Sequence, residues 1–429
     1  MGITKRNGSY TLCVSCGRDI YGKQIRKYQT FTPPPGLTPK QEQKAVDKAY
    51  QEFKSKVENG LIMEGRKITL LEFTERWLDE VATQRLEART LSDYRKELHE
   101  RVLPELGHLK MSDLRPGVLN SFFVNLTKDG VRKDGKPGGY SKSTIRKTRN
   151  VLSSVLSTAA EWEIIENNPL DRVRIQAKES AADKIKFFTP AQAVAFLSYI
   201  EQPYTVHTSG HRRIDDTGKA YQVGDYTTQK ELPEQLRVLF NLAIYGGLRK
   251  GELLALNWSD IDFDADMLSV TKAVSVVDGV ECIKSPKTKT SRRDIAIPHF
   301  LTMRLKSLRL EQRRYRLSVG DYWKGADWVF IQTDGKRMSY STPYSAFHDT
   351  LVRYNDAHPV ADQLPVIPFH GLRHTSATLL ISSNQDIRSV SNRLGHAQTS
   401  TTMNIYAHAL QETDRRAADA LENILVKQA

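Results

Sequence analysis

The chain has 429 residues and a formal net charge of +13 at pH 7. Its 39% of hydrophobic residues argue against general disorder, and its three cysteines are too few for a disulfide framework. No apolar run approaches the roughly 20 residues that span a bilayer, and the N-terminus lacks the apolar stretch of a signal peptide. We therefore expect a soluble, cytoplasmic protein of two or three domains that binds a polyanion, with DNA or RNA as the first candidate.

The N-terminal segment is basic and alternates between apolar and polar side chains. Tyr10, Leu12 and Val14 fall on one side of an extended chain, which indicates a half-buried strand. A helical pattern over residues 38–59 follows, and we expect this helix to cover one face of a small sheet and leave the other for a ligand. Residues 1–62 are predicted to bind DNA, with a solubilising basic leader as the alternative. The expected contacts are Lys5, Arg6, Arg18, Lys23, Arg26 and Lys27.

Cys13 and Cys16 have the spacing of a zinc knuckle, but no second cysteine pair or histidine lies nearby in the sequence. Residues three apart on an extended strand also point to opposite faces, so the two thiolates could not reach one ion. We expect no metal site here.

Residues 67–177 have a helical pattern almost throughout. Thr69 and Glu72 have the spacing of a capping box at the start of an amphipathic helix. A strongly basic stretch over residues 128–149 opens with a glycine-rich loop and continues as another helix. We predict a helical domain that grips the DNA backbone with this edge, and an ordinary solvated helix face is the alternative. The expected contacts are Lys142, Arg146, Lys147 and Arg149.

A polar linker is expected at residues 178–186, followed by a last domain over residues 187–429. Residues 202–232 are polar and show little periodicity, which predicts a long loop or insertion without an assigned role. A buried helix is predicted to begin at Pro233, and alternation over residues 267–297 predicts strands.

Two stretches of this last domain carry specific motifs. The sequences are Gly246-Gly247-Leu248-Arg249-Lys250-Gly251-Glu252-Leu253, and His370-Gly371-Leu372-Arg373-His374-Thr375 followed by Leu394-Gly395-His396 and Tyr406. Starting from His370, the next three of these residues, Arg373, His396 and Tyr406, follow at separations of 3, 23 and 10 residues. Both stretches resemble the conserved boxes of the tyrosine recombinases. The layout of the whole chain resembles the integrases of temperate phages and conjugative transposons, which carry an additional arm-binding domain at the N-terminus.

The resemblance implies a multidomain α+β protein. Its parts would be a small N-terminal β-sheet plus helix that binds arm-type DNA sites, a helical core-binding (SAM-like) domain, and a mainly α catalytic domain with a small antiparallel sheet. Gly371 stands where many relatives have Asp, at a position that is not catalytic. The catalytic residues that the resemblance carries over are Arg249, Lys287, His370, Arg373, His396 and the nucleophile Tyr406.

These residue types suit phosphoryl transfer. Two arginines on one phosphate would clamp the oxygens that gain negative charge in the transition state. A tyrosine hydroxyl, with a pKa of about 10, needs a cationic field or a nearby base, for which His370 and His396 are the candidates. In the family a hairpin lysine protonates the leaving 5′-oxygen; Lys287 matches best and Lys289 is its rival. Lys289 and Arg292 are also expected to contact DNA.

The resemblance implies a site-specific recombinase that cuts and rejoins duplex DNA through a 3′-phosphotyrosine, without a cofactor, to integrate or excise a mobile element or prophage. The implied partners are core and arm attachment sites, four copies of the chain on DNA, an excisionase and a host DNA-bending protein, in the cytoplasm and nucleoid of a bacterium. An amphipathic helix over residues 408–429 would pack either on a neighbouring copy or on its own core.

Three other classes remain open from the sequence. A catalytically silent DNA-binding protein would need the basic surfaces without the joint arginine and tyrosine pattern. A type IB topoisomerase would share the chemistry but not the arm-domain layout. A metal-dependent hydrolase could use His370, His374 and His396, but no acidic partner lies at ligand spacing.

Overall fold

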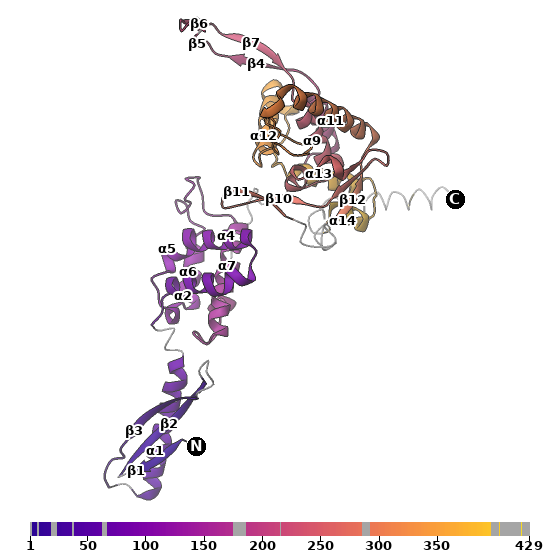
Figure 1. Cartoon of the computed structure of the whole chain (residues 1–429). Helices are drawn as coiled ribbons and strands as arrows, with labels where there is room; N and C mark the ends of the chain where they lie inside the picture. The colour runs from indigo at the N-terminus through magenta and orange to yellow at the C-terminus, as the bar shows by residue number, and fades with distance from the viewer. Residues whose placement is uncertain are drawn as a thin grey trace. The chain divides into compact units, whose positions relative to one another are not determined.

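The computed structural model describes residues 2–6, 8–18, 24–36, 38–61, 67–174, 186–214, 216–284 and 292–395, together with Met403 and Glu422. The chain divides into two compact units, Met1–Asp183 and Lys184–Ala429 (Figure 1). Within the described ranges, no helix is both long enough and apolar enough to cross a bilayer.

The N-terminal part of the first unit is a small antiparallel sheet covered by one helix. Its elements are β1 (Ile3–Arg6), β2 (Ser9–Arg18), β3 (Gln24–Phe31) and α1 (Pro39–Leu61), with the strands in the order β1-β2-β3. Tyr10, Leu12 and Val14 alternate along β2 and are buried with Val46 and Phe53 of the helix. The sheet and its covering helix are therefore as predicted.

The second part of the first unit is mainly helical, as predicted. Its helices are α2 (Leu70–Trp77), α3 (Thr83–Arg85), α4 (Ala88–Glu97), α5 (Leu103–Leu106), α6 (Pro116–Asn125) and α7 (Lys142–Glu161), with π-helical turns at Leu78–Ala82 and Leu98–Val102. The predicted capping box is present, because Glu72 Oε2 accepts from Thr69 N at 2.8 Å and Thr69 Oγ1 accepts from Glu72 N at 3.2 Å. The buried faces form one core, across which Trp77 Nε1 donates to Thr158 Oγ1 at 3.0 Å.

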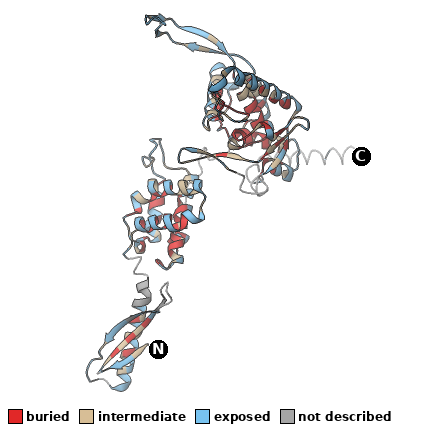
Figure 2. Cartoon of the chain, viewed as in Figure 1, coloured by how far each residue is buried: buried red, intermediate tan, exposed pale blue. Residues whose placement is uncertain are grey.

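The second unit is built around a central buried helix. Its helices are α8 (Pro190–Tyr199), α9 (Glu234–Tyr245), α10 (Lys250–Leu254), α11 (His299–Val319), α12 (Thr342–Ala357), α13 (Gly371–Ser382) and α14 (Ile387–Leu394). Every side chain from Val238 to Ile244 in α9 is buried, because α10, α11, α12 and α13 all contact this helix. Figure 2 shows this core as the red interior of the unit.

Small antiparallel sheets lie beside these helices. Their strands are β8 (Ile261–Asp262), β9 (Met267–Val270), β10 (Ala273–Val277), β11 (Val280–Lys284) and β12 (Arg293–Ala296). One sheet has the order β12-β9-β8, and β10 and β11 form a hairpin around Asp278 and Gly279, both with positive φ. Together with the first unit, this confirms the multidomain α+β fold class.

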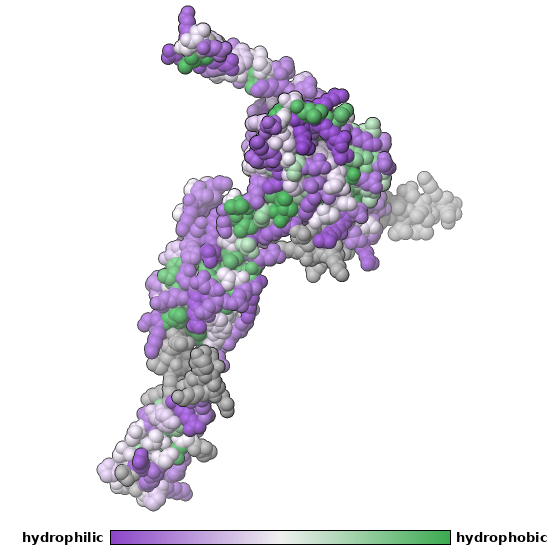
Figure 3. Space-filling model, viewed as in Figure 1, coloured by the Kyte–Doolittle hydropathy of each residue, from purple (hydrophilic) through white to green (hydrophobic). Residues whose placement is uncertain are grey.

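Residues 202–232, predicted to be a long loop or insertion, contain strands and are not a long loop. The segment forms two strand pairs along one ribbon, β4 (Tyr204–Thr208) with β7 (Tyr226–Lys230) and β5 (His211–Ile214) with β6 (Ala220–Val223). Figure 1 shows the ribbon extending from its unit, and Figure 3 shows it mostly hydrophilic. Because almost none of its side chains are buried, the ribbon lacks the apolar alternation by which strands are recognised.

Candidate active site

A glycine turn at the end of α9 places Arg249. Gly247 has a φ of +62°, and a Cβ there would lie 2.7 Å from Leu394 Cδ2, so the position favours glycine for both its conformation and its space. Arg249 follows in extended backbone as the N-cap of α10, and its N–H donates to Glu252 Oε2 at 2.9 Å. The turn therefore leads the chain from the buried helix to a partly open position.

The side chain of Arg249 is hydrogen-bonded within the protein and also partly exposed to solvent. Its Nη1 donates to Glu252 Oε1 at 2.8 Å, and its Nη2 donates to the carbonyl oxygen of Gly395 at 3.0 Å. The side chain nevertheless keeps 37% of its surface exposed. Arg249 can thus present a fixed guanidinium to a ligand from solvent.

The structure brings Arg373 to the same place from α13. Arg373 is only 2% exposed. Its Nη1 donates to Gly247 O at 2.7 Å and its Nη2 to Leu394 O at 2.6 Å. The two arginines therefore grip neighbouring carbonyls of one turn, although 124 residues separate them in the sequence.

A third arginine, which the sequence analysis missed, completes this pattern. Arg293, the first residue of β12, donates from Nε to the carbonyl oxygen of Arg393 at 2.7 Å. The last carbonyls of a helix have no intrahelical partner and carry partial negative charge. Three consecutive carbonyls at the end of α14 thus each accept from a different arginine, and together they gather the cluster (hereafter the arginine cluster: Arg249, Arg293 and Arg373).

Glu252 balances part of this charge. Burial of its carboxyl opposes ionisation, but the hydrogen bonds and charge of Arg293, followed by Arg249, outweigh that effect and lower its pKa to about 2. Glu252 is therefore a fixed anion among three cations. The site keeps a net positive charge, which suits a phosphate ligand.

Two histidines at the start of α13 lie beside the cluster. The rings of His370 and His374 meet edge to face, with centroids 4.8 Å apart. Loss of hydration and the charges of Arg373 and Arg249 lower the pKa of His370, although its ring reaches the surface. Burial, then the neighbouring His370 and Arg373, lower the pKa of His374 to about 4. Both rings are therefore neutral at pH 7, and His370 is available as a proton acceptor.

In the second unit, four predicted catalytic or DNA-contact residues lie outside the described residues: Lys287, Lys289, His396 and Tyr406. The chain on either side of the lysine segment is well anchored. Before it, Glu281 of β11 accepts from Arg337 Nη2 at 2.6 Å and from Tyr340 N at 2.7 Å. After it, Arg293 reaches Glu252. His396 directly follows Gly395, whose carbonyl Arg249 holds.

Comparison with known proteins identifies a family whose models match both units of the chain. Residues 216–413 match the model of the phage integrase family, and residues 69–126 match the phage integrase N-terminal SAM-like domain. The chain belongs to the phage integrase family of tyrosine recombinases. It is a tyrosine-type site-specific recombinase.

A relative and two solved structures show how far the likeness extends. A "tyrosine recombinase XerC-like" protein of Caldanaerobacter subterraneus subsp. tengcongensis is 28% identical over 98% of both chains. The Tn1549 transposon integrase, solved with a circular intermediate DNA, is 19% identical, with a TM-score of 0.63 over 82% of this chain and 99% of that one. The lambda integrase tetramer on a Holliday junction is 18% identical, with a TM-score of 0.51 over 93% of this chain and 96% of that one. The two structures show that the fold is shared.

Only some of the basic residues of the N-terminal sheet lie on the face that α1 leaves uncovered. Arg6 and Arg26 lie on the sheet face opposite the helix and are exposed, and Tyr28 lies on the same face two residues after Arg26. Lys5 instead lies on the helix-covered face, where its Nζ is 2.8 Å from Glu42 Oε1. The side chains of Arg18 and Lys27 and the whole of Lys23 lie outside what the structure describes.

The basic residues of α7 also divide into two groups. Arg146 is exposed, Lys142 is partly exposed, and Lys147 remains half-exposed with its Nζ 3.8 Å from the buried Glu97. Arg149 instead donates from Nη2 to Leu170 O at 2.9 Å, which fixes the chain after the helix. Arg292 of the second unit is exposed.

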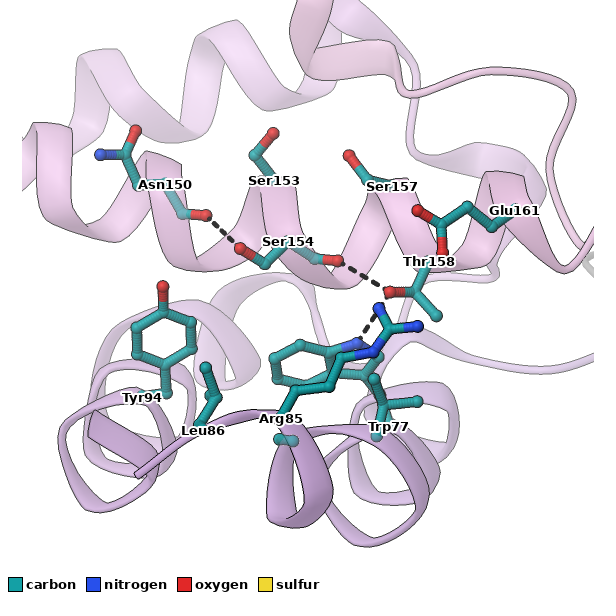
Figure 4. Close-up of a pocket in the computed structure, with 12 residues that line it drawn as sticks. Trp77, Arg85, Leu86, Tyr94, Asn150, Ser153, Ser154, Ser157, Thr158 and Glu161 are labelled. Atoms are coloured by element: carbon teal, nitrogen blue, oxygen red, sulfur yellow. Dashed lines mark hydrogen bonds between the residues drawn. The ribbon is translucent and has the colours of Figure 1, made fainter. Parts of the chain in front are cut away.

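The helical part of the recombinase also contains a hollow of about 440 Å³, shown in Figure 4. Trp77, Arg85 and Tyr94 face a row of polar residues on α7. The hydroxyls of that row are already bonded: Ser153 and Ser157 accept from Asn168, and Ser154 donates to its own helix. The hollow is separate from the arginine cluster, and we assign it no ligand.

Proposed function

We propose that this recombinase integrates and excises a mobile element by cutting and rejoining duplex DNA through a 3′-phosphotyrosine at Tyr406. The observation that carries the proposal is the convergence of Arg249 and Arg373 on adjacent carbonyls, directly before His396. The likeness to a transposon integrase supports the mobile-element role.

In the proposed reaction the two arginines stabilise the charge that develops on the scissile phosphate. Arg249 offers a partly exposed side chain, and Arg373 supplies a buried charge that water screens little. The α14 carbonyls hold both groups in place before DNA arrives, so little reorganisation is needed. No nucleotide is required, because the phosphotyrosine ester keeps the energy of the broken bond.

Proton transfer falls to the remaining residues. His370, neutral at pH 7, takes the proton of the Tyr406 hydroxyl or orients it, and His396 hydrogen-bonds to the phosphate. Lys287, or Lys289 in its place, protonates the leaving 5′-oxygen. The 5′-hydroxyl of a second duplex then attacks the phosphotyrosine and releases Tyr406.

The DNA partners follow from the exposed basic surfaces. The α7 edge contacts the core site through Lys142, Arg146 and Lys147, and the open sheet face contacts the arm site through Arg6 and Arg26. Four copies assemble on two duplexes, as the lambda integrase tetramer does on its junction. An excisionase and a host DNA-bending protein set the direction, in the cytoplasm and nucleoid of a bacterial host.

A nicked duplex carrying the core site tests the proposal. The wild-type protein should become covalently trapped, because the short 5′-fragment diffuses away and cannot religate. Tyr406→Phe should bind the same DNA and form no adduct, and a chelator should leave the wild-type yield unchanged. Binding without an adduct would mark a silent DNA-binding protein, and relaxation without exchange between duplexes would mark a topoisomerase-like enzyme.

A further inference from the structure

Arg293 lies within the arginine cluster, yet neither recombinase box contains it. Its side chain is 7% exposed. Besides its bond to the Arg393 carbonyl, it donates to both carboxylate oxygens of Glu252, from Nη2 at 2.9 Å and from Nη1 at 3.2 Å. Because the buried guanidinium donates both to a carbonyl and to a carboxylate, its position relative to these groups is fixed.

The charge of Glu252 is shared between two arginines. Its Oε1 accepts from both Arg249 and Arg293, and its Oε2 accepts from Arg293 and from the Arg249 backbone. If Arg293 were neutral, the whole carboxylate charge would offset Arg249. The field that Arg249 exerts on a phosphate would then weaken, because opposite charges this close cancel at the ligand.

The same guanidinium also fixes the end of α14. Gly395 has a φ of +66°, and a Cβ there would lie 2.8 Å from Arg293 Nη1, so the turn and the guanidinium are tightly packed. Arg393 reinforces the contact, since its Nη2 donates to Tyr245 O and Ala296 O at 2.8 and 2.9 Å. The carbonyls that hold Arg249 and Arg373 are thereby tied to α9 and β12.

We propose that Arg293 is a positioning residue for strand transfer. It shares the charge of Glu252, so that Arg249 keeps its positive field at the phosphate. It also fixes the end of α14, so that Arg249 keeps its orientation. The inference rests on the proposed function, because it assigns Arg293 to the Arg249 and Arg373 phosphate clamp. It predicts an effect on the chemical step and none on DNA affinity.

Three variants separate this role from simple packing: Arg293→Gln, Arg293→Lys, and the double variant Glu252→Gln/Arg293→Gln. The matched control is Arg304→Gln, which removes another arginine that is paired with carboxylates in the same unit, Glu201 and Glu234. For each protein, the single-turnover rate of adduct formation on the nicked duplex, the DNA dissociation constant and the melting temperature are measured.

Charge sharing predicts a definite order of rates. Arg293→Gln should slow adduct formation about 100-fold, as loss of one electrostatic stabiliser does. Arg293→Lys should be about 10-fold slower than wild type, because it keeps the charge but loses the paired bonds to Glu252 and the bond to α14. The double variant should recover about 10-fold over Arg293→Gln. The control should cleave at the wild-type rate, and all dissociation constants should agree within about 2-fold.

Several results would overturn the inference. They are a wild-type rate for Arg293→Gln, a double variant no faster than Arg293→Gln, or an Arg293→Lys variant that forms the adduct about 100-fold more slowly than wild type. The last comparison also decides the matter if Arg293→Gln does not fold. An absence of wild-type adduct would defeat the proposed function instead, so the two failures are distinguishable.

Discussion

The arginine cluster and the exposed basic surfaces of the first unit differ in what holds their charges. In the cluster, helix-end carbonyls and Glu252 fix every guanidinium, whereas Arg26 and Arg146 are exposed to solvent. Chemistry at phosphorus needs charges placed within a fraction of an ångström, but attraction to a DNA backbone needs only charge of the right sign. The comparison predicts that mutations in the cluster change rates, and that mutations on the basic surfaces change affinity and its salt dependence.

The largest effect is expected when each clamp arginine is replaced by lysine. Arg249→Lys and Arg373→Lys should each slow adduct formation about 100-fold to 1,000-fold, because lysine cannot make the paired bonds. Only Arg373→Lys should also lower the melting temperature, since that side chain is buried and Arg249 is not. Equal melting temperatures for the two variants would contradict the distinction between a buried and an open arginine.

Glu252 gives a pH test of the cluster. Its folded pKa of about 2 lies below the ordinary 4.5, so the stability it adds is present above pH 4.5 and is lost as the pH falls toward 2. That shift corresponds to about 3 kcal/mol. The unfolding free energy of Glu252→Gln, measured in urea, should therefore fall below wild type by about this amount at pH 7 and converge with it in acid. A difference that does not change with pH would show that Glu252 acts through packing alone.

A smaller effect is expected on the N-terminal sheet. Arg26→Ala should weaken binding to arm-site DNA several-fold and lower the slope of log affinity against log salt by about 1. Lys5→Ala is the matched control, because Lys5 is paired with Glu42 on the other face. It should leave the salt slope unchanged, and a lower slope for Lys5→Ala would place the DNA on the helix side.

The smallest effects are expected on α7. Arg146→Ala should reduce core-site affinity a few-fold without changing the melting temperature, because its side chain is exposed. Arg149→Ala should lower the melting temperature and leave the salt dependence intact, since it loses the bond to Leu170 O. The reverse outcome, measured by filter binding and calorimetry, would move the DNA contact to Arg149.

The sequence identified site residues where the motifs fix the spacing between them, and it did not identify those outside the motifs. Arg249 and Arg373 could be found because motif spacing identifies them, and β2 because Tyr10 and Leu12 alternate with polar residues. Arg293 could not, since nothing in the sequence separates it from its exposed neighbour Arg292. Its role depends on the carbonyl of Arg393, 100 residues away, which only the folded chain brings close.

Lys5 and the ribbon at 204–230 show two further limits of sequence analysis. The sequence does not show which face of the sheet Lys5 occupies, because net charge says nothing of this, and the register opposite Tyr10 places it on the helix side. The ribbon was missed because strands with both faces in water carry no apolar period.

The glycines at positions 247 and 395 restrict how this enzyme can change. A methyl group at the first would collide with Leu394, and one at the second would displace Arg293. The carbonyls of both glycines accept hydrogen bonds from the arginine cluster, so a side chain added at either position should impair catalysis and not change the choice of DNA target. Laboratory selection for new insertion sites should therefore leave these two glycines untouched and collect its substitutions on the solvent-facing sheet and α7 instead.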